Sequence, residues 1–360
     1  MDASRKYILS IDGGGIKGII PLCMLARLED QTGQRAGDVF DFVAGTSTGA
    51  IITAGLLTGK SAHEILDLYV TFGSEIFPPA VPGWYFLKRL VLGYMYSVEN
   101  LRAVIARNAG ALATKTLNEL DRDVLVTAVR APDVRAWYFV KDQRDAAGDP
   151  INACTTGGLC LVDCVTASAA APTYFGPWSV PVGAAWPLGD KDKPENLVDG
   201  GVGTAGNPTY QACVEAFDWT GGRYTAQETT VVSLGTGRYV EPNLPSAGLI
   251  PPWRGIRDWA YWVLGALLDS PDEEQTELVH RNFHRPNLGH MFFYRLNPTL
   301  DEQIDLADAG EIPKLRQIGE AFALGIDWPA ILAGTDEEFL VTDHKTRPHQ
   351  YSKRVAVTSS

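Results

Sequence analysis

The segment YILSIDGGGIKG, residues 7–18, determines the fold class. Its first five residues are apolar apart from Ser10, which predicts a short buried strand that ends before Asp12. Apolar residues then recur at helical spacing beyond the glycines, so we expect a helix over about 17–30 that stops at Gly33. A strand, a glycine-rich turn and a helix in this order begin a strand–helix–strand unit.

The same pattern recurs along the chain. Further apolar strands are expected over residues 40–44, 124–129, 137–140 and 229–234. Helical patterns lie between them, at residues 50–57, 101–106 and 210–217. The strand segments are almost continuously apolar, which is typical of a parallel sheet covered on both faces. We therefore predict an α/β fold, a three-layer sandwich with a mainly parallel central sheet.

No linker divides the chain. We expect one domain over residues 5–325, whose motifs fall within 7–240, and a polar tail over 345–360. Residues 241–340 are expected to be a mainly helical part of the same unit. Their apolar stripe consists of Ile312, Leu315, Ile318 and Phe322.

The composition limits the classes of partner. The chain has 31 Lys and Arg against 43 Asp and Glu, a formal net charge of −12. This excess argues against a nucleic-acid groove and against electrostatic anchoring to anionic lipids. No apolar stretch reaches the roughly 18 residues of a spanning helix, and five cysteines without paired spacing indicate reduced thiols. We expect a cytoplasmic protein with no nucleic-acid partner.

Two glycine motifs resemble nucleotide sites. GGGIKG at 13–18 matches the dinucleotide fingerprint after a strand, but the second strand does not end in the acid that would hold a ribose. A nucleotide-binding protein using this loop remains the alternative function. AGLLTGKS at 54–61 resembles a phosphate loop but follows a helix rather than a strand, so we expect capping, with Ser61 and Glu64 forming a capping box.

The third motif, GTSTG at 45–49, is a nucleophile elbow that follows a strand and begins a helix. Gly45 and Gly49 leave room for the sharp turn, and Ser47 is the expected nucleophile. The N–H groups of Gly13, Gly14 and Gly15, with the charge of Lys17, are the expected oxyanion site.

A serine nucleophile needs a base. None of the six histidines follows an apolar strand or lies between glycines, and the pair His280 and His284 is interpreted as a solvated helix face rather than a metal site. Asp199 precedes Gly200 and Gly201 in a turn that permits close backbone approach, and it is the candidate base. We expect no metal ion and no cofactor.

Taken in order, DGGGIKG at 12–18, GTSTG at 45–49 and DGG at 199–201 resemble the patatin-like phospholipase family. SAAAP at 168–172 and SLGTG at 233–237 agree with it, whereas Gly206 stands where relatives commonly have asparagine. The resemblance implies that Ser47 and Asp199 form a catalytic dyad and that residues 13–15 are the oxyanion loop.

The resemblance also implies a substrate. It predicts a lipid acyl hydrolase that cleaves fatty-acyl esters of phospholipids through an acyl-serine, with peripheral membrane contact. Some compact bacterial enzymes resembling this chain are anti-phage effectors switched on by a cyclic nucleotide, so a small cyclic-nucleotide activator stays open. The sequence does not indicate an oligomeric state.

Two aromatic segments have an open role. Residues 77–96 and 250–268 are rich in Trp, Tyr and Phe. They fit an apolar lip at a membrane interface or an aromatic core under long loops equally well.

Overall fold

The computed structural model describes residues 5–76, 94–145, 147–151, 156–180, 195–203, 206–239, 274–283 and 291–341. Most of the two aromatic segments and the polar tail therefore lie outside the described residues. Of the first segment, Tyr96 is described, and its ring packs 5.8 Å from that of Phe175, between centroids.

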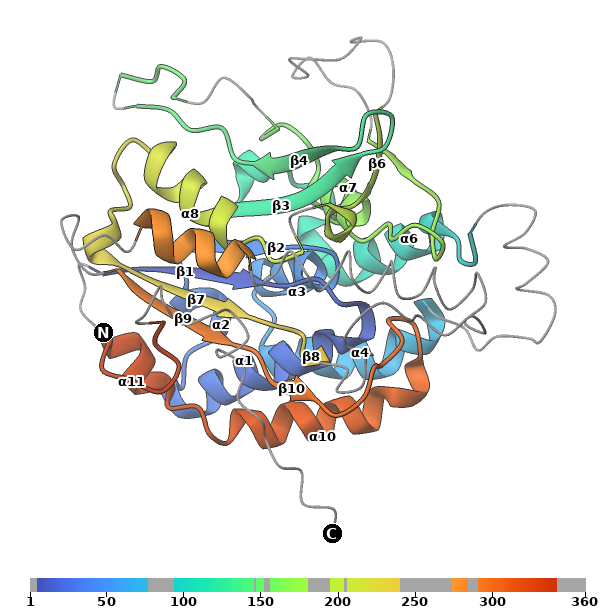
Figure 1. The fold of residues 1–360 in the computed structure, drawn as a ribbon. Helices are drawn as coiled ribbons and strands as arrows, with labels where there is room; N and C mark the ends of the chain where they lie inside the picture. The colour runs from blue at the N-terminus through green and yellow to red at the C-terminus, as the bar shows by residue number, and fades with distance from the viewer. Residues whose placement is uncertain are drawn as a thin grey trace, which may run out of the picture.

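A twisted central sheet runs through the molecule (Figure 1). Its eight described strands are β1 Lys6–Ile11, β2 Phe42–Gly45, β3 Asp123–Arg130, β4 Arg135–Val140, β5 Trp178–Val180, β6 Glu195–Asp199, β7 Thr229–Leu234 and β9 Phe292–Leu296. Their order is β5-β6-β3-β2-β1-β7-β9, with β4 also pairing with β3. The pairs from β3 through β2, β1 and β7 to β9 are parallel, whereas β4, β5 and β6 join antiparallel. β8 Arg238–Tyr239 and β10 Thr299–Leu300 form a separate parallel pair.

Helices cover both faces of the sheet. They are α1 Ile19–Thr32, α2 Ala36–Val39, α3 Thr48–Leu57, α4 Ala62–Ile76, α6 Val98–Ala109, α7 Leu161–Ser168, α8 Thr209–Asp218, α10 Ile312–Ala323, α11 Trp328–Ala333 and residues 274–283. Alternate strand residues enter different cores: Leu9 packs with α1 and α10, whereas Ile8 packs with α8. Because both faces are buried, the strands are apolar at nearly every position.

The predicted three-layer α/β fold is confirmed. Helix α1 begins at Ile19 rather than near Lys17, because Gly15–Gly18 first form a 3-10 turn. It ends at Gly33, as expected, where φ is 66°. The capping box before α4 is also present: Ser61 N–H donates to Glu64 Oε2 at 2.7 Å, and Glu64 N–H to Ser61 Oγ at 3.1 Å.

Strand β9 was not predicted. The C-terminal part was expected to be mainly helical, but Phe292–Leu296 pairs in parallel with β7 inside the main sheet. The strand carries Arg295, which is 5% exposed. A charge in a buried strand breaks the apolar pattern, and its compensating partner, Asp12, comes from the other end of the chain.

The helices of the described residues are short, and α4, the longest of them, has 15 residues. Not one of them combines the length and the apolar character that crossing a membrane needs.

Candidate active site

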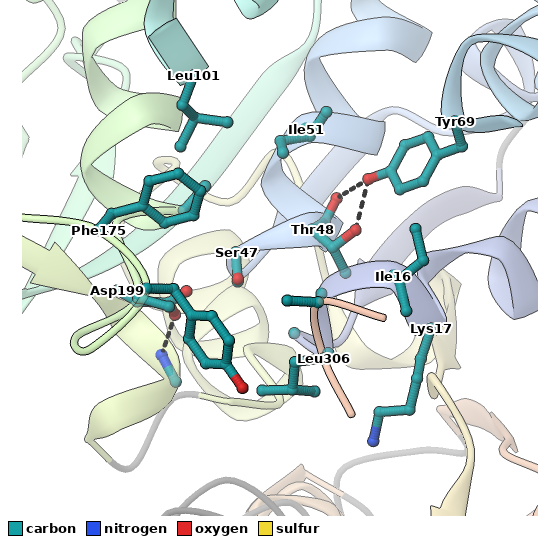
Figure 2. A pocket seen from close by; sticks show the side chains of 18 of the residues that line it. Ile16, Lys17, Ser47, Thr48, Ile51, Tyr69, Leu101, Phe175, Asp199 and Leu306 are labelled. Carbon is teal, nitrogen blue, oxygen red and sulfur yellow. Dashed lines mark hydrogen bonds between the residues drawn. The ribbon is translucent and has the colours of Figure 1, made fainter. Parts of the chain in front are cut away.

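The register of the sheet brings Ser47 and Asp199 together. β2 ends at Gly45, which pairs with Val126 of β3. β3 continues past β2, and Ala128, two residues further on, pairs with Asp199 at the end of the antiparallel β6. Ser47 follows Gly45 by two residues and so comes level with Asp199, and Figure 2 shows the two side chains facing each other. The Ser47 hydroxyl lies close enough to the Asp199 carboxylate to lower its pKa.

Ser47 occupies a strained turn between β2 and α3. Its φ of 55° and ψ of −119° are a conformation that costs a non-glycine residue about 1–3 kcal/mol. The backbone around it is tightly packed: a Cβ at Gly45 would lie 2.3 Å from Gly49 O, and one at Gly49 would lie 2.2 Å from Ile11 O. Both elbow glycines are therefore required by close backbone approach.

Surrounding side chains hold this turn in place. Ser47 N–H donates to Ser168 Oγ at 2.9 Å, at the end of α7. The Tyr69 hydroxyl bonds the hydroxyl of Thr48 and, at 3.2 Å, the Thr48 carbonyl (Figure 2). Burial raises the pKa of Tyr69 well above its usual value, so it stays a neutral donor. Side chains of two neighbouring helices, α7 and α4, therefore hold Ser47 in its strained conformation.

Asp199 is a buried carboxylate with few compensating contacts. It is 3% exposed, and its Oδ1 accepts the Gly201 N–H at 2.8 Å. Burial raises its pKa to about 6, against the lowering effects of the nearby Ser47 hydroxyl and of the Gly201 N–H. A carboxylate with this pKa is ionised at neutral pH and is a stronger base than an ordinary aspartate.

The glycine loop differs in one respect from the prediction. The Gly13 N–H, expected as an oxyanion donor, donates to Gly206 O at 2.9 Å and is occupied. Within the described residues, the N–H groups of Gly14 and Gly15 have no acceptor. The loop lies against the elbow, because a Cβ at Gly13 would be 3.3 Å from Ser47 Cβ. The available donors beside Ser47 are therefore those of Gly14 and Gly15.

Lys17, which follows the glycine loop, does not lie beside Ser47 (Figure 2). It is 8% exposed, and Figure 2 shows its side chain extending away from Ser47. The charge expected from the sequence is therefore present near the loop but points away from Ser47 (Figure 2).

A cavity of about 390 Å³ has Ser47 and Asp199 in its wall. One part extends between α3, α4 and α6 and is mostly apolar. Its lining includes Ile51, Ala54, Gly55, Ile65, Leu68, Leu101, Val104 and Ile105. We call this part the apolar arm. The cavity as a whole, at about 390 Å³, is within the range of roughly 300–1,000 Å³ that small-molecule sites show.

The other side of the cavity is closed by residues 303–307, which the sequence did not indicate. The Leu306 carbonyl accepts the Ile16 N–H at 2.8 Å. Asp305 Oδ1 accepts the Tyr174 hydroxyl at 3.1 Å. A Cβ at Gly15 would lie 2.2 Å from Leu306 O, so this contact requires glycine there. Residues far down the chain therefore complete the wall beside the glycine loop.

The described histidines lie elsewhere. His63 pairs with Asp30 at 3.0 Å on the surface. The prediction of a solvated face was wrong for His280, which is 3% exposed because its helix, residues 274–283, packs on the sheet beside α8. His284 and the remaining histidines fall outside the described residues. No group of residues suited to a metal ion occurs in the part that the structure describes.

Sequence reasoning missed two supports of the elbow. Ser168 had a signal, since it begins the SAAAP segment, but nothing in that segment indicated a bond to the Ser47 backbone. Tyr69 had none, because an aromatic residue on an amphipathic helix is most often ordinary core.

Comparison with known proteins gives a family match. The family model described as patatin-like phospholipase matches residues 9–212. A protein of Escherichia coli (strain TW11681) named cGAMP-activated phospholipase is 28% identical over 292 residues, which cover 78% of this chain and 76% of that protein. A protein of the same name from Vibrio cholerae is 30% identical over 226 residues, 59% of this chain and 58% of that protein.

Among solved structures, human GIVD cytosolic phospholipase A2 aligns with a TM-score of 0.45 and 11% identity. The alignment covers 93% of this chain and 60% of that one.

Proposed function

Because the chain belongs to the patatin-like phospholipase family, we propose that it cleaves fatty-acyl esters of membrane phospholipids, with Ser47 as nucleophile and Asp199 as its base. The observation that carries this proposal is that the Ser47 hydroxyl faces a buried carboxylate, that of Asp199, in the wall of a mostly apolar cavity (Figure 2). A lipid hydrolase needs these three things in one place: a nucleophile, its base and room for an acyl chain.

The first half-reaction forms the acyl-serine. Ser47 Oγ attacks the ester carbonyl carbon while Asp199 accepts the hydroxyl proton. The N–H groups of Gly14 and Gly15 stabilise the oxyanion, a contribution of roughly 3 kcal/mol per donor. The carbonyl then re-forms, the ester C–O bond breaks, and the proton held by Asp199 passes to the departing lysophospholipid oxygen.

The second half-reaction repeats these steps with water. Asp199 accepts a proton from a water molecule, whose oxygen attacks the acyl carbon. The bond to Ser47 Oγ breaks, the serine regains its proton from Asp199, and the free fatty acid leaves. One carboxyl group therefore serves both half-reactions, first as base and then as acid.

We assign the apolar arm to the fatty-acyl chain. Gly55 lies on α3 in the wall of this arm, and a Cβ there would be 2.7 Å from Ile65 Cδ1. Gly55→Leu should fill the arm and lower kcat/KM for a long-chain p-nitrophenyl ester at least about tenfold, since one or two methylene groups change apolar recognition by that much. The butyrate ester should be cleaved within about twofold of the wild-type rate. Parallel kinetics on the two esters measure the ratio.

The matched control is Gly325→Leu, a substitution of the same kind at an exposed position beyond α10 and outside the cavity wall. It should change neither rate. Equal losses for the long and short esters in Gly55→Leu would contradict the assignment.

We also extend the regulation of the relatives to this chain. Two bacterial relatives are named cGAMP-activated phospholipase, which favours activation of this chain by a cyclic nucleotide. With phospholipid vesicles, fatty acid and lysophospholipid should appear in equal amounts, at least about tenfold faster when cGAMP is added. Mass spectrometry of the lipid products is the measurement. A nucleotide-binding protein that uses the loop at 13–18 would instead bind the nucleotide and release no fatty acid.

A further inference from the structure

A buried ion pair lies directly behind the glycine loop. Asp12 is the residue between β1 and the loop, and Arg295 belongs to β9. The guanidinium binds both carboxylate oxygens, with Nη1 to Oδ1 at 2.9 Å and Nη2 to Oδ2 at 2.5 Å. The side chain of Asp12 is 1% exposed and that of Arg295 is 5% exposed. A two-pronged contact of this kind fixes the orientation of the carboxylate as well as its position.

Hydrogen bonds fix the two residues that come just before Gly14, namely Asp12 and Gly13. Asp12 N–H donates to Leu234 O at 3.0 Å. Gly13 is held at both ends, because its N–H donates to Gly206 O at 2.9 Å and its carbonyl accepts the Thr236 hydroxyl at 2.7 Å. Gly14 follows at once, with φ of 156°. The position of the Gly14 and Gly15 N–H groups therefore depends on where Asp12 and Gly13 are held.

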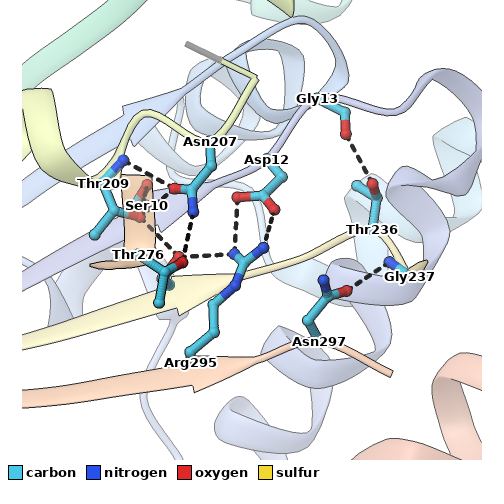
Figure 3. A network of polar contacts seen from close by, with 11 residues as sticks. Ser10, Asp12, Gly13, Asn207, Thr209, Thr236, Gly237, Thr276, Arg295 and Asn297 are labelled. Carbon is cyan, nitrogen blue, oxygen red and sulfur yellow. Dashed lines mark hydrogen bonds and ion pairs between the residues drawn. The ribbon is translucent and has the colours of Figure 1, made fainter. Parts of the chain in front are cut away.

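The same network extends to the segment that follows Asp199 (Figure 3). Arg295 Nη1 also donates to Ser233 Oγ at 2.8 Å, and Ser233 Oγ bonds Thr209 Oγ1 at 2.7 Å. Thr209 N–H in turn donates to Asn207 Oδ1 at 3.0 Å, next to the Gly206 carbonyl that Gly13 contacts. One guanidinium is thus connected to two of the segments that hold the loop.

A buried pair of charges is a weak way to stabilise a fold. Two well-packed apolar side chains of similar size commonly stabilise as well or better, because the desolvation of both charges is avoided. An apolar pair, however, makes no hydrogen bonds and so cannot fix the orientation of the backbone next to it. The bidentate geometry beside two free N–H donors points to orientation as the role of this pair.

We propose that Arg295 is a positioning residue which, through Asp12, holds the Gly14 and Gly15 N–H groups where the oxyanion forms. This inference rests on the proposed ester hydrolysis and extends it to a residue of the C-terminal strand. Arg295 is not among the residues that line the cavity, so it acts through the residues that hold the loop, Asp12 above all.

The test replaces both charges at once. Asp12→Leu combined with Arg295→Met leaves no unpaired buried charge, so this double variant should fold with a melting temperature close to that of the wild type. Its kcat on a soluble short-chain ester should fall about a hundredfold with little change in KM, since a displacement of about 1 Å in catalytic groups costs that much. Arg295→Lys keeps a positive charge for Asp12 but loses the two-pronged contact of the guanidinium. The kcat of this variant should fall about tenfold.

A second readout separates positioning from folding. A trifluoromethyl ketone forms a tetrahedral adduct with a serine nucleophile and places an oxyanion at the donors, whereas a free fatty acid binds mainly through its chain in the apolar arm and forms no such adduct. Affinity for the ketone should fall in parallel with kcat/KM across Arg295→Lys and the double variant. Affinity for the fatty acid should stay within about twofold of the wild type, because the arm is untouched.

The control is Arg223→Met. Arg223 pairs at 3.0 Å with Asp123, another buried carboxylate, at the opposite end of the strands from Ser47. This variant should keep wild-type kcat and ketone affinity. Wild-type turnover in Arg295→Lys, or losses of ketone and fatty-acid affinity in equal measure, would overturn the proposal. Failure of the proposed function has a different signature, a wild-type protein that neither cleaves the ester nor binds the ketone.

Discussion

Ser47→Ala should lower phospholipid and soluble-ester turnover by at least about a thousandfold, the largest effect expected of any single change in this chain. The substitution removes the atom that forms the acyl bond, while the free N–H groups of the loop and the cavity remain. Residual rates of nucleophile-deleted hydrolases come from such surviving groups, so the loss should be large but not complete. Initial rates on vesicles and on a p-nitrophenyl ester measure it.

Covalent labelling gives an independent measure of the same claim. The wild type should take up one equivalent of a fluorophosphonate on the peptide that contains Ser47, and Ser47→Ala should take up none. Ser179→Ala is the matched control, because Ser179 lies on β5 and bonds Asn196 on an exposed part of the surface. If Ser47→Ala were still labelled at full stoichiometry, the nucleophile would have to be sought among other hydroxyl groups.

The elbow and its sheet could be predicted because their signals are local. Tyr7–Ile11 and the segment before Gly45 are apolar at nearly every position, which is typical of strands buried on both faces. The glycines on either side of Ser47 are likewise demanded by backbone atoms within a few residues along the chain or on the adjacent strand. Sequence pattern carries this kind of information well.

What could not be predicted depends on register and on distant partners. No pattern near Gly13 indicates that its N–H is taken by Gly206, and none near Arg295 indicates that a charge inside a strand is matched by Asp12. The proximity of Ser47 to Asp199 came from the family resemblance rather than from spacing. Its physical reason, the antiparallel pairing of Asp199 with Ala128, is visible only in three dimensions.

Asp199→Asn should lower kcat/KM by about a thousandfold, because the amide keeps the shape of the carboxylate but cannot accept the hydroxyl proton. The amide oxygen can still accept the hydrogen bond from the Gly201 N–H, so the turn should keep its conformation. Fatty-acid affinity should not fall, since the chain still fills the apolar arm and the amide removes the repulsion between two carboxylates. Steady-state kinetics at pH 8 and product-binding titrations measure both.

The pH profile of the wild type tests the same carboxylate without mutation. Because burial raises the pKa of Asp199 to about 6, kcat/KM should be flat above pH 7 and fall about tenfold per pH unit below 6. The residual rate of Asp199→Asn should show no inflection near pH 6, because the amide does not titrate there. A wild-type profile that stays level down to about pH 4.5, well below the pKa of a buried base of this kind, would contradict the assignment of Asp199.

Stability should change in the opposite direction to activity. The folded-state pKa of Asp199 lies above that of an ordinary aspartate, so folding favours its protonated form. Its contribution to the free energy of unfolding is then greatest below about pH 4 and is lost as the pH rises through 6. Asp199→Asn carries no charge to desolvate and should melt at a higher temperature than the wild type at pH 8, with the difference shrinking as the pH is lowered. A variant that is inactive yet more stable would mean that the fold tolerates a buried charge at a cost because catalysis needs it, whereas a variant both inactive and less stable at pH 8 would mark Asp199 as a structural residue.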